Sequence, residues 1–256
     1  MIILKSEEEI GLMIQGGKFL GDILQQVIDA VEPGAATSEL DKLAERLLLK
    51  TGGEPSFKKV ANYQFATCMC VNDVVVHGLP SDYRLQEGDV LGIDIGLLYK
   101  GFNTDTAWTV IVGDSKLEKV ENKKKIEFLN IGKLALKTAI EQVKVGNHIG
   151  DISIAIQEKV EGAGFSVVPT LVGHGVGRKL HEDPQIPGVL TRQIEKTPPL
   201  KEGMTLAIEI IYNEGQPEIV SSNKDFWTIR TKDKSLSGLF EKTVAITANG
   251  PIVLTI

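Results

Sequence analysis

The stretch VLGIDIGLLYKGFNTDTAWTVIV at residues 90–112 predicts the centre of the fold, because it contains two strands around one tight turn. In the first strand, alternation puts the leucine and isoleucine side chains on one face and Asp94 on the other, between two glycines. The second strand carries Asp105. We expect a hairpin centred between Tyr99 and Lys100, which would place the two aspartates directly opposite each other.

Two carboxylates directly opposite in a hairpin have Cβ atoms about 4.5–5.5 Å apart and repel each other. A divalent cation between Asp94 and Asp105 is the simplest way to offset that repulsion. The alternative is a pair of exposed, solvated aspartates, which is the simpler interpretation when the hairpin is taken alone.

The glycine-rich segment GHGVGRKLHEDP at residues 173–184 holds two of the four histidines of the chain, His174 and His181. Glycines let the backbone approach a site closely. Their spacing is not that of a dinucleotide-binding loop, and the two histidines are too far apart for the helical zinc motif. A third, His77, ends an apolar strand before a Gly/Pro loop, where functional residues concentrate. His148 lies in a polar loop between helices, and we assign it no role.

Two glutamates lie within apolar strands. A carboxylate in such a run either faces solvent from a half-exposed sheet or is buried with a partner. The run around Glu209 is apolar on both faces, which favours burial beside a metal or a base. For Glu241, the neighbouring Lys242 keeps an exposed strand open as the alternative.

Hydrophobic periodicity predicts the order helix, helix, strands, repeated twice. The first helix is expected to begin at Ser6, which forms a capping box with Glu9, and to end before Pro33. Further helices are expected at 37–51, 123–143 and 151–162. Strands are expected at 65–76, 89–112, 205–212, 226–231, 240–247 and 252–256, and a proline-rich loop at 179–202. This order predicts an α+β fold of two similar halves. Because no linker separates the halves, we expect residues 1–256 to form a single domain.

Composition limits the class of protein. The 256 residues are 42% hydrophobic and 24% charged with a net charge of −6, as in a soluble globular protein without a nucleic-acid partner. We expect no membrane span, because no long apolar run occurs, and no signal peptide at the N-terminus. Two cysteines only, Cys68 and Cys70, fit a reducing cytoplasm.

Taken together, these segments resemble the type I methionine aminopeptidases. The resemblance rests on His77-Gly78, Asp94 and Asp105 eleven positions apart, GHGVG at 173–177 followed by His181, Gly203-Met204-Thr205 leading to Glu209, and finally Glu241. It covers nearly the whole chain. It implies the pita-bread (creatinase/aminopeptidase) fold, in which two pseudo-symmetric halves place helices over a curved antiparallel sheet.

The resemblance also implies a dinuclear metal site and a substrate pocket. The ligands would be Asp94, Asp105, His174, Glu209 and Glu241, and they would hold two divalent ions; this donor set suits Co²⁺, Mn²⁺, Fe²⁺ or Zn²⁺. Glu209 would also act as the general base, while His181 would contact the scissile carbonyl and His77 the substrate amide. The methionine pocket would be lined by Tyr63, Cys68 and Trp227.

The implied activity is removal of the initiator methionine from nascent chains when the second residue is small, by metal-activated water attack on the peptide bond. A transient ribosome contact and a monomeric state are implied with it. One alternative is an X-Pro aminopeptidase or dipeptidase of the same fold, and another is a non-catalytic binding module. The chain departs from the family pattern at Leu180, where an aromatic residue is common, at Gln64, and at Ile210, which follows Glu209 in place of proline.

Overall fold

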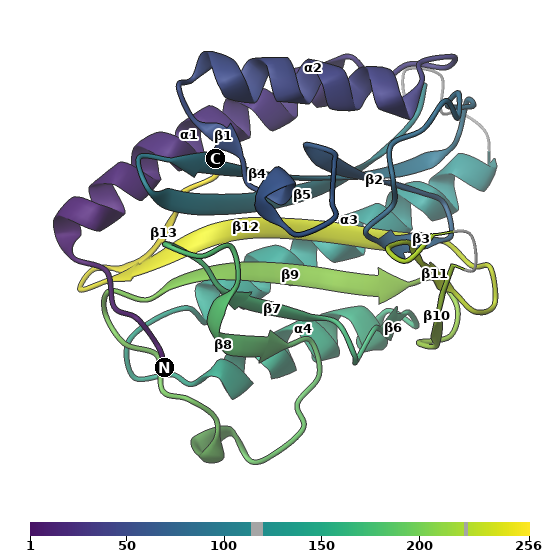
Figure 1. Ribbon diagram of the computed structural model, residues 1–256. Helices are drawn as coiled ribbons and strands as arrows, with labels where there is room; N and C mark the ends of the chain where they lie inside the picture. The colour runs from purple at the N-terminus through teal and green to yellow at the C-terminus, as the bar shows by residue number, and fades with distance from the viewer. Residues whose placement is uncertain (114–119, 223–224) are drawn as a thin grey trace.

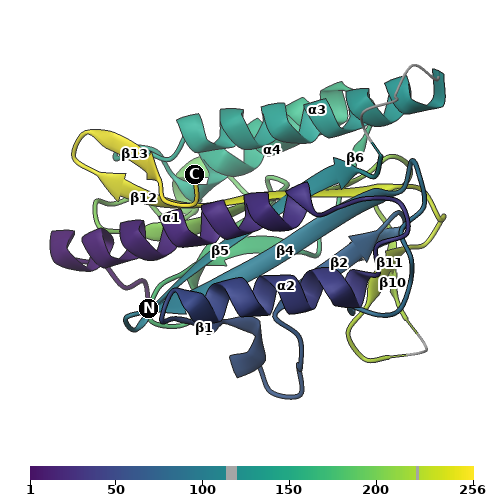
Figure 2. The same ribbon diagram turned by 90° about the horizontal axis from the view of Figure 1, so that it is seen from above.

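The computed structural model describes residues 1–113, 120–222 and 225–256 and has an α+β architecture. Its helices are α1 (Glu7–Asp29), α2 (Thr37–Lys50), α3 (Val120–Glu141) and α4 (Ile149–Gly162), with short 3-10 helices at Phe57–Lys59 and Ile194–Lys196. All four α-helices lie over the same face of a large antiparallel sheet (Figure 2).

The large sheet has ten strands, in which β4, β5, β12 and β9 lie side by side at the centre (Figure 1). Its strands are β1 (Glu54–Pro55), β2 (Thr67–Val71), β4 (Val90–Tyr99), β5 (Phe102–Ile111), β6 (Ser166–Val167), β7 (Val172–Gly175), β8 (Glu182–Pro187), β9 (Thr205–Asn213), β12 (Ser237–Thr247) and β13 (Gly250–Val253). A small second sheet contains β3 (Val74–Val76), β10 (Ile219–Ser221) and β11 (Ile229–Thr231).

The helices form two pairs that cover different parts of the large sheet. The first pair is α1 and α2, and α1 packs on β4 and β5, whereas α3 of the second pair packs on β12 and β9. The predicted capping box is confirmed, since the Ser6 hydroxyl accepts from the Glu9 N–H and the Glu9 carboxylate accepts from the Ser6 N–H. The predicted order of two helix pairs, each followed by strands, is thus confirmed.

The apolar face of β4 lies against α1 and α2. Leu91, Ile93 and Ile95 are fully buried in one core with leucines of both helices. Alternation therefore directs Asp94 to the face that no helix covers, as predicted. A second core lies between the other helix pair and the strands β9 and β12.

The register of the β4–β5 hairpin corrects the prediction by two residues. Lys100 and Gly101 both have positive φ, 48° and 87°, and form a two-residue turn. As a result Asp94 lies opposite Ala107, and Asp105 lies opposite Gly96. The two aspartates are not directly opposite each other, but an even shift keeps both on the same face.

Strand β8 is a second difference from the prediction, because it lies inside the segment expected to be a proline-rich loop. Pro184 and Pro187 argued against a strand here, because proline has no backbone N–H to donate to a neighbouring strand. Among the described strands β8 pairs only with β7, so it is an edge strand of the large sheet, and edge strands tolerate proline. The strand expected at 65–76 is also divided, with β2 in the large sheet and β3 in the small one.

Within the described residues, no helix is long and apolar enough to span a bilayer.

Candidate metal centre

Four strands place carboxylates in one row across the uncovered face of the sheet. Asp94 of β4 pairs with Ala107 of β5, which pairs with Glu241 of β12. Glu241 pairs on its other side with Glu209 of β9. Asp105 lies two positions from Ala107 along β5 and therefore projects from the same face. The small alanine leaves space within the row where the two halves of the fold meet.

His174 joins this row from β7. It pairs with Ala207, two positions from Glu209, so its ring lies above the same face. Its Nδ1 is 2.8 Å from the Gly175 carbonyl oxygen, and its Nε2 is 3.4 Å from Glu209 Oε1. With Nδ1–H donating to the carbonyl, the Nε2 lone pair is directed into the site, which is the arrangement of a metal-ligating histidine. Burial lowers the pKa of His174 to about 4, which keeps the ring neutral.

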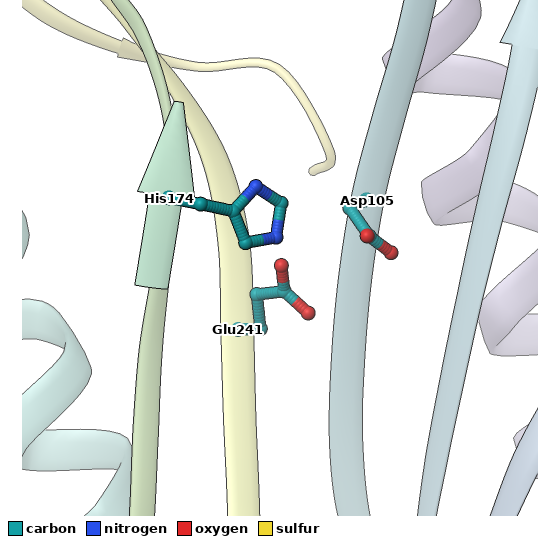
Figure 3. A group of neighbouring side chains, drawn as sticks. All are labelled: Asp105, His174 and Glu241. Carbon is teal, nitrogen blue, oxygen red and sulfur yellow. The ribbon is translucent and has the colours of Figure 1, made fainter. Parts of the chain in front are cut away.

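Asp105, His174 and Glu241 converge on one point. One ligand atom from each lies within 4.8 Å of the other two, and their side chains come from three different strands (Figure 3). Asp105 and Glu241 are only 4% and 3% exposed, which excludes the solvated alternatives. Lys242, which had suggested an exposed strand, projects to the opposite face, where its ammonium lies 5.4 Å from the centre of the Trp108 ring.

Among the described residues, no lysine or arginine forms an ion pair with Asp94, Asp105, Glu209 or Glu241. Burial raises the pKa of Asp94 to about 7, against a weaker opposing hydrogen bond from the Cys68 thiol. Burial, followed by repulsion from neighbouring carboxylates, raises the pKa of Asp105, Glu209 and Glu241 well above the usual values.

Glu241 Oε1 has no hydrogen-bond partner among the described residues, although it is buried. Buried, mutually repelling carboxylates with an unpartnered oxygen and a neutral imidazole fit divalent cations.

Two cavities adjoin this centre and have His174 and Glu209 among their shared lining residues. The smaller, of about 160 Å³, is lined by Tyr63, Cys68, Trp227, His77, His181 and the five candidate ligands, together with Phe57, Val60, Val76, Leu180 and Leu239. The larger, of about 620 Å³, contains His77, His174, His181 and Glu209 and extends along β7 and β8. All ten predicted site residues therefore surround one cavity.

The smaller cavity continues the carboxylate row into an apolar pocket. Cys68 of β2 pairs directly with Asp94, so the pocket wall is next to a candidate ligand. The Tyr63 hydroxyl donates to the Thr67 carbonyl oxygen at 2.8 Å and contacts Cys68 Sγ at 3.2 Å. Its ring meets the edge of Trp227, with centroids 5.0 Å apart. These contacts fix the aromatic walls.

Phe57 and Val60 also line the pocket, which the sequence did not predict. They belong to a 3-10 turn and its end, which no periodic pattern marks. Of the three departures from the family pattern, only Leu180 lines the pocket. Ile210 is fully buried in the core beneath α3 and α4, on the face opposite Glu209, so its replacement of proline removes nothing from the site.

His77 and His181 line both cavities, as do the candidate ligands His174 and Glu209. His77 has a positive φ of 55°, a conformation that non-glycine residues rarely adopt and that is often kept at functional sites. Loss of hydration lowers the pKa of both rings, and for His77 the nearby His181 adds to this effect. Both rings are therefore neutral near pH 7, so each has one N–H donor and one acceptor nitrogen.

Comparison with known proteins identifies the family. Residues 11–248 match the model of metallopeptidase family M24. The chain belongs to metallopeptidase family M24. This M24 chain is 43% identical over 256 residues to the methionine aminopeptidase of Clostridium perfringens, covering 100% of this chain and 99% of the relative.

Solved structures agree with the sequence comparison. The crystal structure of methionine aminopeptidase from Thermotoga maritima superposes with a TM-score of 0.93 at 39% identity, covering 100% of this chain and 99% of the other. The prolidase from Pyrococcus furiosus gives a TM-score of 0.77 at 27% identity, and the match spans 65% of its chain. The expected pita-bread fold, the hydrolase class and the likeness to methionine aminopeptidases are thereby confirmed. As an M24 metallopeptidase, the protein uses divalent metal.

Proposed function

We propose that this M24 metallopeptidase removes the N-terminal methionine from peptides and nascent proteins whose second residue is small. The observation that carries the proposal is the row of paired residues across the sheet, which runs from Cys68 through Asp94 to Glu241 and Glu209. This row places an apolar pocket directly beside the candidate metal ligands. We further propose that residues 1–256 act as a single catalytic domain.

The five candidate ligands would hold two divalent ions. Asp105 and Glu241 would be shared between the ions, Asp94 would complete one site, and His174 with Glu209 the other. Co²⁺, Mn²⁺, Fe²⁺ and Zn²⁺ all suit this set of oxygen donors and one imidazole. When bound, the ions would supply the Lewis acidity that activates a water for attack on the peptide carbonyl.

The neighbouring side chains perform the proton transfers and hold the substrate. Glu209 would accept the proton of the attacking water on a carboxylate oxygen and transfer it to the leaving amine. The N–H of the neutral His181 ring would donate to the oxygen of the scissile carbonyl as negative charge develops there. His77, which also lines both cavities, would hold the substrate amide.

The residues that line the two cavities support an activity at the N-terminus of a peptide chain. The small pocket offers the aromatic faces of Tyr63 and Trp227 and the thiol of Cys68 to a thioether side chain. The α-amine would then lie near Asp94, and the chain beyond the scissile bond would leave through the larger cavity. Leu180 in place of an aromatic residue makes this pocket wall less bulky.

The cellular setting of the reaction follows from the resemblance alone. We propose that the enzyme is cytoplasmic and monomeric and that it meets nascent chains in a brief contact with the ribosome. The net charge of −6 favours neither a nucleic acid nor an anionic membrane as a partner.

The proposed function is tested by the release of free amino acids from short peptides. We expect methionine release from Met-Ala-Ser and Met-Gly-Ser, at most slow release from Met-Leu-Ser, complete loss with a chelator and recovery with added Mn²⁺ or Co²⁺. Faster turnover of Ala-Pro than of Met-Ala would favour the prolidase-like alternative. Absence of both turnover and bound metal would leave a binding module.

A further inference from the structure

The segment 176–182 leads from β7 into the first residue of β8, carries His181 and is held by contacts with the N-terminal segment and with β5 and α1. The His181 ring lies against the His174 ring, with centroids 4.5 Å apart. Within the described part of the chain, no hydrogen bond holds the His181 side chain. Its position therefore depends on the backbone on either side of it.

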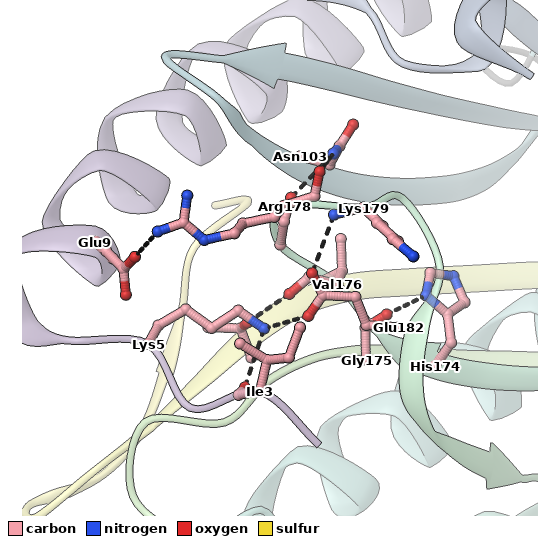
Figure 4. A network of polar contacts seen from close by, with 12 residues as sticks. Ile3, Lys5, Glu9, Asn103, His174, Gly175, Val176, Arg178, Lys179 and Glu182 are labelled. Carbon is pink, nitrogen blue, oxygen red and sulfur yellow. Dashed lines mark hydrogen bonds and ion pairs between the residues drawn. The ribbon is translucent and has the colours of Figure 1, made fainter. Parts of the chain in front are cut away.

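A buried ion pair holds the residue that follows His181. Lys5 Nζ lies 2.6 Å from Glu182 Oε2, and both side chains are only 2% exposed (Figure 4). The other oxygen, Glu182 Oε1, accepts from the Lys179 N–H at 3.0 Å. Both carboxylate oxygens are thus occupied, one by the N-terminal segment and the other by the turn that leads to His181.

The N-terminal segment is itself held in place, so its ion pair with Glu182 restrains the position of that residue. The Lys5 N–H donates to the Gly203 carbonyl oxygen at 2.7 Å, just before strand β9. The Lys5 side chain also fills the space beside Gly177, where a Cβ would lie only 2.4 Å from Lys5 Cε. A side chain at 177 would therefore displace the lysine.

Other contacts hold the first half of the segment, and at the His181 end the ladder pairing of Glu182 with Gly175 acts together with the ion pair to Lys5. Asn103 Nδ2 donates to the Gly177 carbonyl oxygen at 2.9 Å, and Arg178 pairs with Glu9 of α1 (Figure 4). Glu182 is the anchored residue next to His181. Removing one partner of a buried ion pair leaves an uncompensated charge, which displaces the backbone around it.

We propose that Lys5 and Glu182 are positioning residues for His181, so that a lysine of the N-terminal segment influences the rate of the reaction through the placement of this ring. This inference rests on the role proposed for His181. Lys5 does not line either cavity, whereas Glu182 lies at the wall of the larger one, so Lys5 is the partner that we expect to act through the segment alone.

The test compares Lys5→Met and Glu182→Gln with the unchanged enzyme. Glutamine keeps an oxygen for the Lys179 N–H while the charge is lost. Glu54→Gln is the matched control, because Glu54 makes the same kind of ion pair with Lys59 on the surface, where both side chains are more than half exposed. Each variant is assayed for kcat, KM, bound metal and hydrogen exchange of the segment 176–182.

We expect both test variants to lower kcat by ~10–10²-fold, since misplacement of a reacting group by about 1 Å costs up to ~10²-fold. KM and bound metal should stay within twofold, exchange of the segment should accelerate, and the control should match the unchanged enzyme. Unchanged kcat and exchange in Glu182→Gln, the milder of the two changes, would overturn the proposal even if Lys5→Met failed to fold.

A double variant separates this inference from the proposed function. In a His181→Ala background, Lys5→Met should lower kcat no further, because its only route to the reaction has been removed. A full additional loss would overturn the positioning role. If His181→Ala alone left kcat unchanged, the role proposed for His181 would fail, and with it any effect of Lys5 through that ring.

Discussion

Asp105→Asn is expected to lower kcat for methionine release by at least ~10³-fold, even at saturating metal. Asp105 is the candidate ligand on β5, beside the row, and lies close to both His174 and Glu241. The change keeps the shape of the side chain but removes the negative charge that a shared ligand supplies. Loss of metal-assisted charge stabilisation costs several kcal/mol, and each 1.36 kcal/mol is a factor of ten in rate.

The measurement is steady-state kinetics together with elemental analysis of bound metal. Asp89→Asn is the control, because Asp89 is also buried but accepts hydrogen bonds from Asn72 and Tyr83 and lines neither cavity. We expect the control to retain kcat and metal. If Asp105→Asn kept its metal and lost less than tenfold in kcat, Asp105 would not be a shared ligand.

His77→Ala is expected to lower kcat by ~10²–10⁴-fold while the bound metal is retained. His77 lines both cavities and is not part of the cluster formed by Asp105, His174 and Glu241. The range is that of a lost proton-transfer or oxyanion-stabilising group.

The matched control for this change is His148→Ala, since His148 precedes α4 and lines neither cavity. It should leave kcat and bound metal unchanged. Metal loss in His77→Ala would contradict the separation of the metal ligands from the histidines that contact substrate.

Strand alternation made the faces of the sheet predictable. In β4 the period of two assigns Asp94 to the uncovered face whatever its partner strand, because the alternate positions are apolar. The register was less predictable, since it depends on which two residues adopt positive φ in the turn. The predicted pairing of β4 with β5 was wrong by two positions, because Lys100 and Gly101 form the turn. A shift by an even number of positions leaves every side chain on the predicted face of the sheet.

Other parts of the site had no local signal in the sequence. Phe57 lies in a 3-10 turn, which has no periodic pattern in the sequence. The prolines of β8 made this edge strand look like a loop. The partnership of Lys5 and Glu182 joins residues 177 positions apart. Lysines and glutamates are common on surfaces, so only the fold shows that this pair is buried.

Anomalous diffraction from crystals prepared with Mn²⁺ would test the central claim most directly. We predict two peaks on the uncovered face of the sheet, both beside Asp105 and Glu241, one of them also beside Asp94 and the other beside His174 and Glu209. Peaks elsewhere in the molecule, with this cage of side chains empty, would contradict the account.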